Sequence, residues 1–134
     1  MSTAKVTYLG KLRTQCEHLK SGATYITDAP LDNNGKGEAF SPTDTVATAL
    51  ASCMITMMGI KAEKLDISLS DTTAMVTKTM SVDPRRISRI DIEITVPVSL
   101  SEKFQRILEN TANTCPVLYS LHPDIEKAIV FHWG

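Results

Sequence analysis

The sequence lacks an excess of charge of either sign. Its 134 residues include 14 basic and 15 acidic side chains, which gives a formal net charge of −1. Proteins that hold nucleic acid or an anionic bilayer through a general electrostatic field carry a clear positive excess, so we expect neither partner. The one basic cluster, Arg85, Arg86 and Arg89, lies beside Asp83 and Asp91 and is interpreted as a solvated strand end.

Long uninterrupted hydrophobic runs are also missing. The most apolar stretch, residues 46–60, contains Thr48, Ser52 and Thr56 and falls short of the roughly 18 apolar residues of a membrane span. The N-terminal residues show no long apolar segment of the kind found in secretory signals. We therefore expect no membrane partner and a cytoplasmic location.

Several common site motifs are absent. Gly35 and Gly37 are followed by neither a strand-to-helix turn nor a Lys-Ser/Thr pair, which excludes a phosphate-binding loop. No nucleophile elbow of a Ser-His-Asp hydrolase is present. Structural zinc needs four ligands in closely spaced pairs. Cys115 and His122 are only two possible ligands and are not part of such pairs. We predict no metal and no bound cofactor.

Cysteine is scarce, with only Cys16, Cys53 and Cys115. An odd, low count without a secretory signal argues against a secreted disulfide scaffold. In the reducing cytosol, a cysteine pair is more often catalytic, redox-active or metal-binding than structural. The cysteines are therefore the residues from which any catalytic hypothesis starts.

What the sequence does contain is the composition of one soluble globular domain spanning residues 1–134, with 43% hydrophobic and 22% charged residues. Residues 90–96 alternate between apolar and polar side chains, as in a strand with one buried face. Asp83–Arg86 is predicted to be a hairpin turn. Strands are predicted over residues 5–9, 12–20, 23–27, 67–80, 87–96 and 125–133.

A long helix is predicted to begin after Ser41. Ser41 is a suitable N-cap, Pro42 fits the first helical position, and Asp44 completes a capping-box pattern. Side chains at helical spacing then continue nearly to Lys64, about six turns later. This apolar stripe consists of Val46, Ala49, Leu50, Cys53, Met54, Met57 and Ile60.

Two shorter helices are predicted over residues 101–113 and 115–121. The resulting order, three strands, a long helix, two strands, two helices and a final strand, lacks the regular alternation of a doubly wound sheet. It predicts an α+β fold with antiparallel sheets.

Local chemistry distinguishes two of the cysteines. Cys53 lies in the middle of the long helix, where a cysteine alone is most often a small buried hydrophobe. Cys115 directly precedes Pro116 and so is expected at a helix N-cap, where backbone N–H groups favour a thiolate. Cys115 is therefore predicted to have the lower pKa, unless a cation is brought to Cys53.

Two segments together resemble the OsmC/Ohr family of osmotically inducible and organic-hydroperoxide-resistance proteins. They are SPTDTVATALASCMITMMG at residues 41–59 and NTCPVLYSLHPDIE at residues 113–126. The segment GKGEAFSPTD at 35–44 and the predicted hairpin at 83–97 are also similar to the family. The resemblance therefore extends over nearly the whole chain.

The resemblance implies an OsmC-like fold, with antiparallel sheets packed around a long central helix, in an intertwined homodimer with active sites at the subunit interface. It implies a peroxidase in which Cys53 attacks a small organic hydroperoxide and Cys115 resolves the sulfenic acid as a disulfide. Arg13 is the residue that looks equivalent to the arginine activating the first thiol. The reductant that the resemblance implies is an external dithiol of the lipoyl type.

One departure concerns the carboxylate that holds this arginine. The hydroperoxide-resistance branch has Pro-Glu at the start of the long helix, whereas this chain has Pro42-Thr43-Asp44. Asp44 and Glu38 are the candidate carboxylates for Arg13, and Asp44 also suits a purely capping role.

Two functions stay open at this point. The first is a cysteine-based peroxidase, favoured by the retained cysteine pair. The alternative is a non-catalytic, binding or redox-sensing member of the same fold, favoured by the departure at Thr43. Cys16 is expected to be a spare thiol. Apolar side chains near the cysteines fit either a hydroperoxide pocket or, more often, ordinary core; they are Phe40, Met54, Met57, Met58 and Leu118.

Overall fold

Two three-stranded sheets organise the chain, one in each of two compact units. The computed structural model describes all residues 1–134, and the units comprise residues 1–46 and 47–134. The sheet orders are β1-β2-β3 and β4-β5-β6. The long helix α1 (Pro42–Lys64) begins in the first unit and continues through the second.

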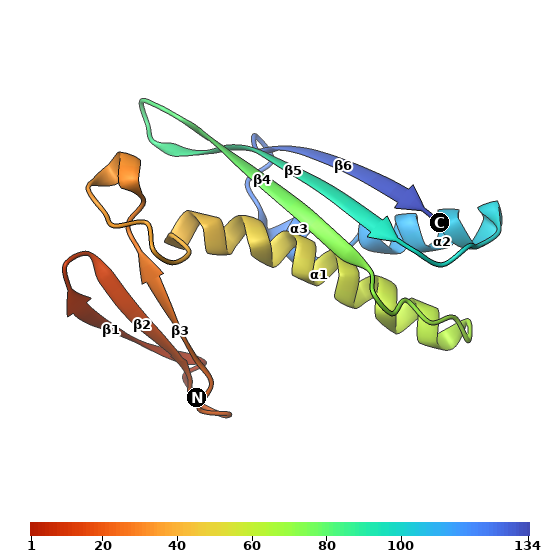
Figure 1. The fold of residues 1–134 in the computed structure, drawn as a ribbon, viewed down its shortest axis with the longest axis horizontal. Coiled ribbons are helices and arrows are strands. Elements are labelled where there is room, and N and C mark those ends of the chain that lie inside the picture. Colours follow the sequence, from red (N-terminus) through yellow and green to blue (C-terminus); the bar gives the residue numbers. More distant parts are fainter. The chain divides into compact units, whose positions relative to one another are not determined.

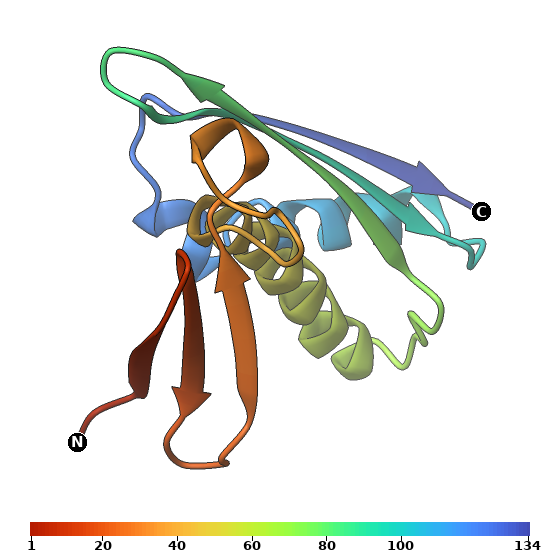
Figure 2. The same ribbon diagram turned by 60° about the vertical axis from the view of Figure 1, so that its left-hand side comes forward.

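The first sheet is an antiparallel meander of β1 (Ala4–Gly10), β2 (Arg13–His18) and β3 (Thr24–Asp28), shown in Figure 2. Lys11 and Leu12 take positive φ angles of 53° and 64° between β1 and β2, as tight hairpin turns require. A short helix η1 (Leu31–Asn33) follows β3. The three predicted strands are confirmed.

The start of α1 is held by the predicted capping box. The backbone N–H of Asp44 donates to Ser41 Oγ at 3.0 Å, and the N–H of Ser41 donates to Asp44 Oδ2 at 3.0 Å. These bonds satisfy two groups that a helix start leaves without partners. One side of the helix is buried throughout its length, at Ala47, Leu50, Ala51, Met54, Met58 and Ala62.

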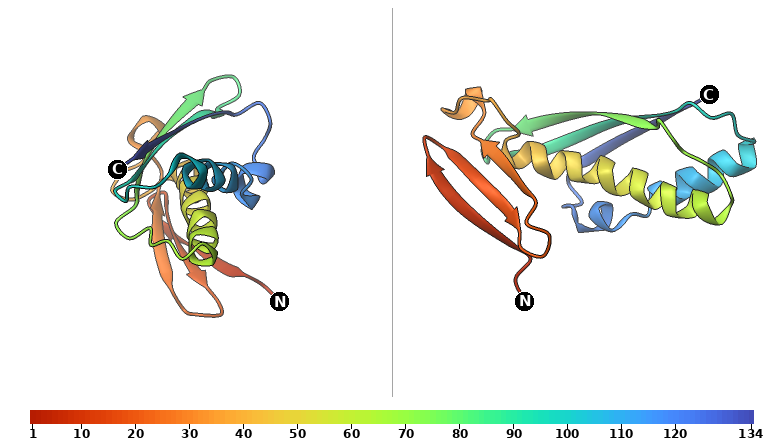
Figure 3. Two further views of the ribbon diagram at one scale, coloured as in Figure 1. Left: turned by 90° about the vertical axis from the view of Figure 1, so that its right-hand side faces the viewer. Right: turned by 60° about the horizontal axis from the view of Figure 1, so that its bottom comes forward.

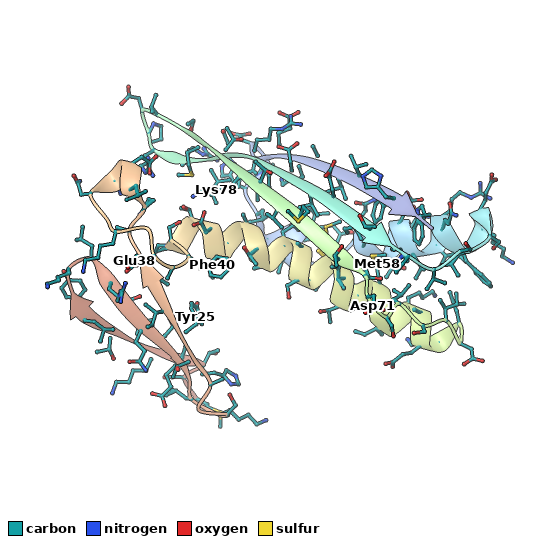
Figure 4. All side chains as sticks on the ribbon, viewed as in Figure 1. Tyr25, Glu38, Phe40, Met58, Asp71 and Lys78 are labelled. Carbon is teal, nitrogen blue, oxygen red and sulfur yellow. The ribbon has the colours of Figure 1, made fainter.

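The second sheet packs against α1 to form the hydrophobic core (Figure 1). Its strands are β4 (Thr73–Ser81), β5 (Arg86–Val96) and β6 (Glu126–Trp133). The predicted alternation in β5 is confirmed, and its inward side chains Ile90, Ile92, Ile94 and Val96 are all fully buried. Met58 lies on the side of α1 that faces this sheet (Figure 4).

The α+β class is confirmed, but the second sheet is mixed rather than purely antiparallel. β4 and β5 form an antiparallel hairpin, whereas β6 runs parallel to β5. The connection between them carries α2 (Glu102–Ala112) and α3 (Pro116–Ser120), and α2 lies on the same side of the sheet as α1 (Figure 3). Such a helical crossover returns the chain to the same end of the sheet, so the next strand is parallel.

Two features differ from their sequence interpretation in detail. β4 begins at Thr73 rather than residue 67 because positive φ angles at Asp66 and Asp71 bend the chain before it. By length and composition alone, α1 is also apolar enough to cross a membrane. Its buried side chains belong to the core of the second unit, so we interpret it as a core helix.

Candidate functional site

Cys53 and Cys115 lie next to each other in the second unit, although 62 positions (115 − 53) separate them in the sequence. Cys53 is in α1 and partly buried; Cys115 is the N-cap residue of α3 and is fully buried. Both are free thiols, and they are close enough for the Cys53 side chain to shift the pKa of Cys115. The fold thus brings together the two cysteines that the sequence singled out.

The prediction of a low pKa for Cys115 is wrong. Burial raises the pKa of the Cys115 thiol, because an ionised sulfur would lose its hydration there. The backbone N–H groups of Leu118 and Val117 act in the expected direction and lower it, while the Cys53 thiol raises it further. The N-cap donors are therefore present, but desolvation outweighs them.

Arg13 is held in the first unit by a buried carboxylate. Its Nε donates to Asp28 Oδ1 at 2.7 Å and its Nη2 donates to Asp28 Oδ2 at 2.9 Å. The two residues are directly opposite each other in the register of β2 and β3. Asp28 is only 1% exposed, and Arg13 is 33% exposed. Such a two-bond pair fixes the plane of the guanidinium as well as its position.

The same carboxylate also anchors the loop that precedes α1. The backbone N–H of Glu38 donates to Asp28 Oδ2 at 3.1 Å. The Glu38 side chain, labelled in Figure 4, accepts a longer bond from Arg13 Nη2 at 3.5 Å and is 63% exposed. The Arg13 guanidinium holds the pKa of Asp28 below its usual range, despite burial, with smaller help from the Glu38 N–H and from Lys36. Asp28 in turn raises the pKa of Arg13.

Asp28 is the functional candidate that the sequence analysis missed. The sequence near the start of the helix suggested Asp44 and Glu38 instead. Glu38 makes a weaker contact with Arg13 than Asp28 does, and Asp44 binds the N–H of Ser41. Asp28 could have been found from the pairing of the second and third predicted strands, because their register places residue 28 opposite residue 13.

The remaining candidates have separate places. Cys16 lies on β2 opposite Tyr25, and its sulfur is 3.9 Å from Thr14 Oγ1. Met54 and Met58 are fully buried core residues, so they do not line an open pocket. Met57 and Leu118 are partly buried against the core, while Phe40 is exposed.

Comparison with known proteins places these features in a family. Residues 35–129 match the family model of OsmC-like proteins, a span that includes parts of both units. The crystal structure of a protein from Psychrobacter arcticus 273-4, provisionally named as an osmotic stress induced and detoxification response protein, has 57% identity. Its TM-score is 0.96, and the match covers 98% of this chain and 96% of that chain.

More distant solved structures share the fold. The organic hydroperoxide resistance protein OsmC from Legionella pneumophila has a TM-score of 0.77 at 17% identity, covering 98% of this chain and 96% of that one. A provisionally named organic hydroperoxide resistance protein from Vibrio cholerae, with captopril bound in one of its active sites, has a TM-score of 0.71 at 16% identity, covering 98% and 92%. Among curated proteins, none matches the sequence.

The Arg13–Asp28 pair predicts a specific acid sensitivity. Because the pKa of Asp28 is lowered by folding, its stabilising contribution is present above about pH 4, the ordinary value for aspartate, and is lost as the pH falls through the lower folded value. Asp28→Asn should lower the free energy of unfolding at pH 7 and flatten its decline at acidic pH. Denaturant unfolding of both proteins across the acidic range measures this.

Asp91→Asn is the matched control. Asp91 also pairs with an arginine, Arg89, but both side chains are 38% exposed, so solvent weakens the interaction. We expect a smaller effect in this variant. Parallel acid curves for the wild type and Asp28→Asn would contradict the ionised, buried pair.

Proposed function

Because this chain belongs to the OsmC-like family, we propose that it is a thiol-dependent peroxidase that reduces organic hydroperoxides. The contact between Cys53 and Cys115 carries this proposal. The Cys53 thiolate attacks one oxygen of the hydroperoxide, the O–O bond breaks, and the other oxygen leaves as an alcohol after taking a proton. The resulting Cys53 sulfenic acid condenses with the Cys115 thiol, which forms a disulfide and releases water.

The different surroundings of the two thiols support this division of roles. Cys53 is partly exposed, so a small substrate can approach it, whereas Cys115 has no exposed surface. The raised pKa of Cys115 keeps it protonated and unreactive toward peroxide until the sulfenic acid forms beside it. Cys53 is therefore assigned as the nucleophile and Cys115 as the resolving thiol.

Formation of a thiolate is not enough by itself to make the reduction of a hydroperoxide fast. With an ordinary pKa of about 8.5, roughly 3% of a thiol is ionised at neutral pH, and a pKa lower by about two raises this to about three-quarters. The gain is about 25-fold, and the nucleophilicity of the sulfur falls as its pKa falls. Cleavage of the O–O bond also needs stabilisation of the departing alkoxide.

We assign this stabilisation to Arg13, following the family resemblance. Asp28 holds Nε and Nη2 of the guanidinium, and Nη1 is bonded to neither Asp28 nor Glu38. An arginine whose orientation is fixed along one edge can present its other edge to a thiolate or an alkoxide. Asp28 thus takes the orienting role for which the sequence suggested Asp44 and Glu38.

An exposed apolar stripe on α1 supports an intertwined homodimer with active sites at the subunit interface. Val46 and Ile60 are 40% and 48% exposed and lie seven residues before and after Cys53, a spacing that puts the three on one helix face. No residue from 45 to 60 is charged. A second copy of the chain would cover the exposed parts of Val46 and Ile60, and the nucleophile would then lie in a site that the two copies share and that stays open to small molecules.

The catalytic cycle requires an external dithiol to reduce the disulfide. The family resemblance favours a lipoyl-type dithiol over a resident cofactor. With cumene hydroperoxide and dihydrolipoamide, Cys53→Ser should lower the rate of peroxide loss at least about 100-fold, because the nucleophile is gone. Cys115→Ser should still consume the first equivalent of peroxide, because Cys53 is intact, but it should form no disulfide within the chain.

Cys16→Ser is the control with a thiol outside the pair and should leave the rate unchanged. Equal rates for Cys53→Ser and the wild type would remove Cys53 from the mechanism. Rapid disulfide formation with negligible turnover by every dithiol tried would instead identify a redox-sensing protein.

The dimer makes a separate prediction. Light scattering should give twice the 14.7 kDa mass of one chain. Ile60→Glu should shift the protein toward the monomer, since it places a charge in the apolar interface, whereas Met75→Glu, at a 71% exposed position on β4, should not. A monomer mass for the wild type would contradict the shared site.

A further inference from the structure

The two sulfurs of the pair differ in their access to solvent. Cys115 has 0% of its surface exposed, enclosed within the core of the second unit. Cys53 lies at the edge of that core and is partly exposed. Thiol–disulfide exchange needs the attacking sulfur to reach one particular sulfur of the disulfide, so this difference decides where reduction begins.

Starting from the disulfide of the proposed function, we propose that the external dithiol attacks the sulfur of Cys53 and not that of Cys115. A bond forms between the reductant's thiolate and Cys53 Sγ, and the bond between Cys53 and Cys115 breaks. Its electron pair passes to Cys115 Sγ, which takes a proton. The second thiol of the reductant then attacks the reductant's first sulfur, which is bonded to Cys53 in the mixed disulfide. This step releases the Cys53 thiolate and leaves the reductant as a cyclic disulfide.

Leaving-group chemistry acts in the opposite direction but is the weaker effect. Burial raises the pKa of Cys115, which makes its thiolate a poorer leaving group. This slows the step by on the order of a few-fold for each pKa unit. A fully buried sulfur, in contrast, allows no contact with an external thiol until the structure opens locally. Access of the external thiol therefore decides which sulfur is attacked. The poor leaving group, Cys115, only lowers the rate of that attack.

The surroundings of Cys53 indicate a suitable probe. The nearest charged residues in the sequence of α1 are Asp44 and Lys61, so the helix around Cys53 is uncharged. A small uncharged monothiol, 2-mercaptoethanol, reaches such a surface without electrostatic bias. Since it has no second thiol, the mixed disulfide it forms persists long enough to be located.

The test uses Cys16→Ser protein whose Cys53–Cys115 disulfide is made with diamide. This oxidant forms the disulfide without peroxide chemistry, so a loss of peroxidase activity and a failure of this inference stay distinguishable. After brief exposure to 2-mercaptoethanol, acid quenching, alkylation and peptide mass mapping should show the adduct on Cys53 and the alkyl group on Cys115, by at least about 10 to 1. Adducts mainly on Cys115, equal adducts, or no disulfide with diamide would each overturn the inference.

A second measurement tests access directly in two variants with one cysteine each. In Cys16→Ser/Cys115→Ser protein, the remaining Cys53 should react with 5,5′-dithiobis(2-nitrobenzoate) at least about 10-fold faster than Cys115 does in Cys16→Ser/Cys53→Ser protein. The difference should vanish in denaturant, which exposes both thiols. Equal rates in the folded proteins would contradict the proposal even if both variants fold normally.

Discussion

Burial of Cys115 against the long helix is the constraint on which the chemistry of this protein depends. The core formed by α1 and the inward side chains of β5 fixes the helix, and the turn before α3 places the Cys115 sulfur beside Cys53. The same burial that brings the sulfurs together deprives Cys115 of hydration and access. In the proposed peroxidase cycle, Cys53 is consequently the thiol that meets hydroperoxide and reductant, and Cys115 reacts only with Cys53.

Burial also determines how the charged part of the candidate site, the pair of Arg13 and Asp28, is held. Asp28 is almost completely buried, yet its two bonds to Arg13 and one from the Glu38 N–H keep it ionised. A buried carboxylate satisfied in this way restrains the guanidinium far better than an exposed ion pair would. The carboxylate that binds Arg13 comes from β3, next to Arg13 in the sheet, so the departure at Thr43 leaves the arginine with a strong partner; its role in orienting a catalytic arginine belongs to the proposed function.

Sequence reasoning succeeded where the determining interactions are local. The capping box at Ser41, the extent of α1 and the alternation of β5 depend on residues a few positions apart, and all are confirmed. The parallel direction of β6, the burial of Cys115 and the pair of Arg13 with Asp28 depend on contacts between distant segments. Only the family resemblance anticipated the contact between Cys53 and Cys115, and no local pattern revealed that desolvation would raise the pKa of Cys115.

The pairing of Cys53 with Cys115 is tested most directly by a count of thiols after one equivalent of cumene hydroperoxide per chain, followed by mapping of disulfide-linked peptides. We expect that two of the three thiols disappear, that the peptides of Cys53 and Cys115 become joined, and that Cys16 stays free. Consumption of Cys16 in place of Cys115, or survival of all three thiols, would contradict it.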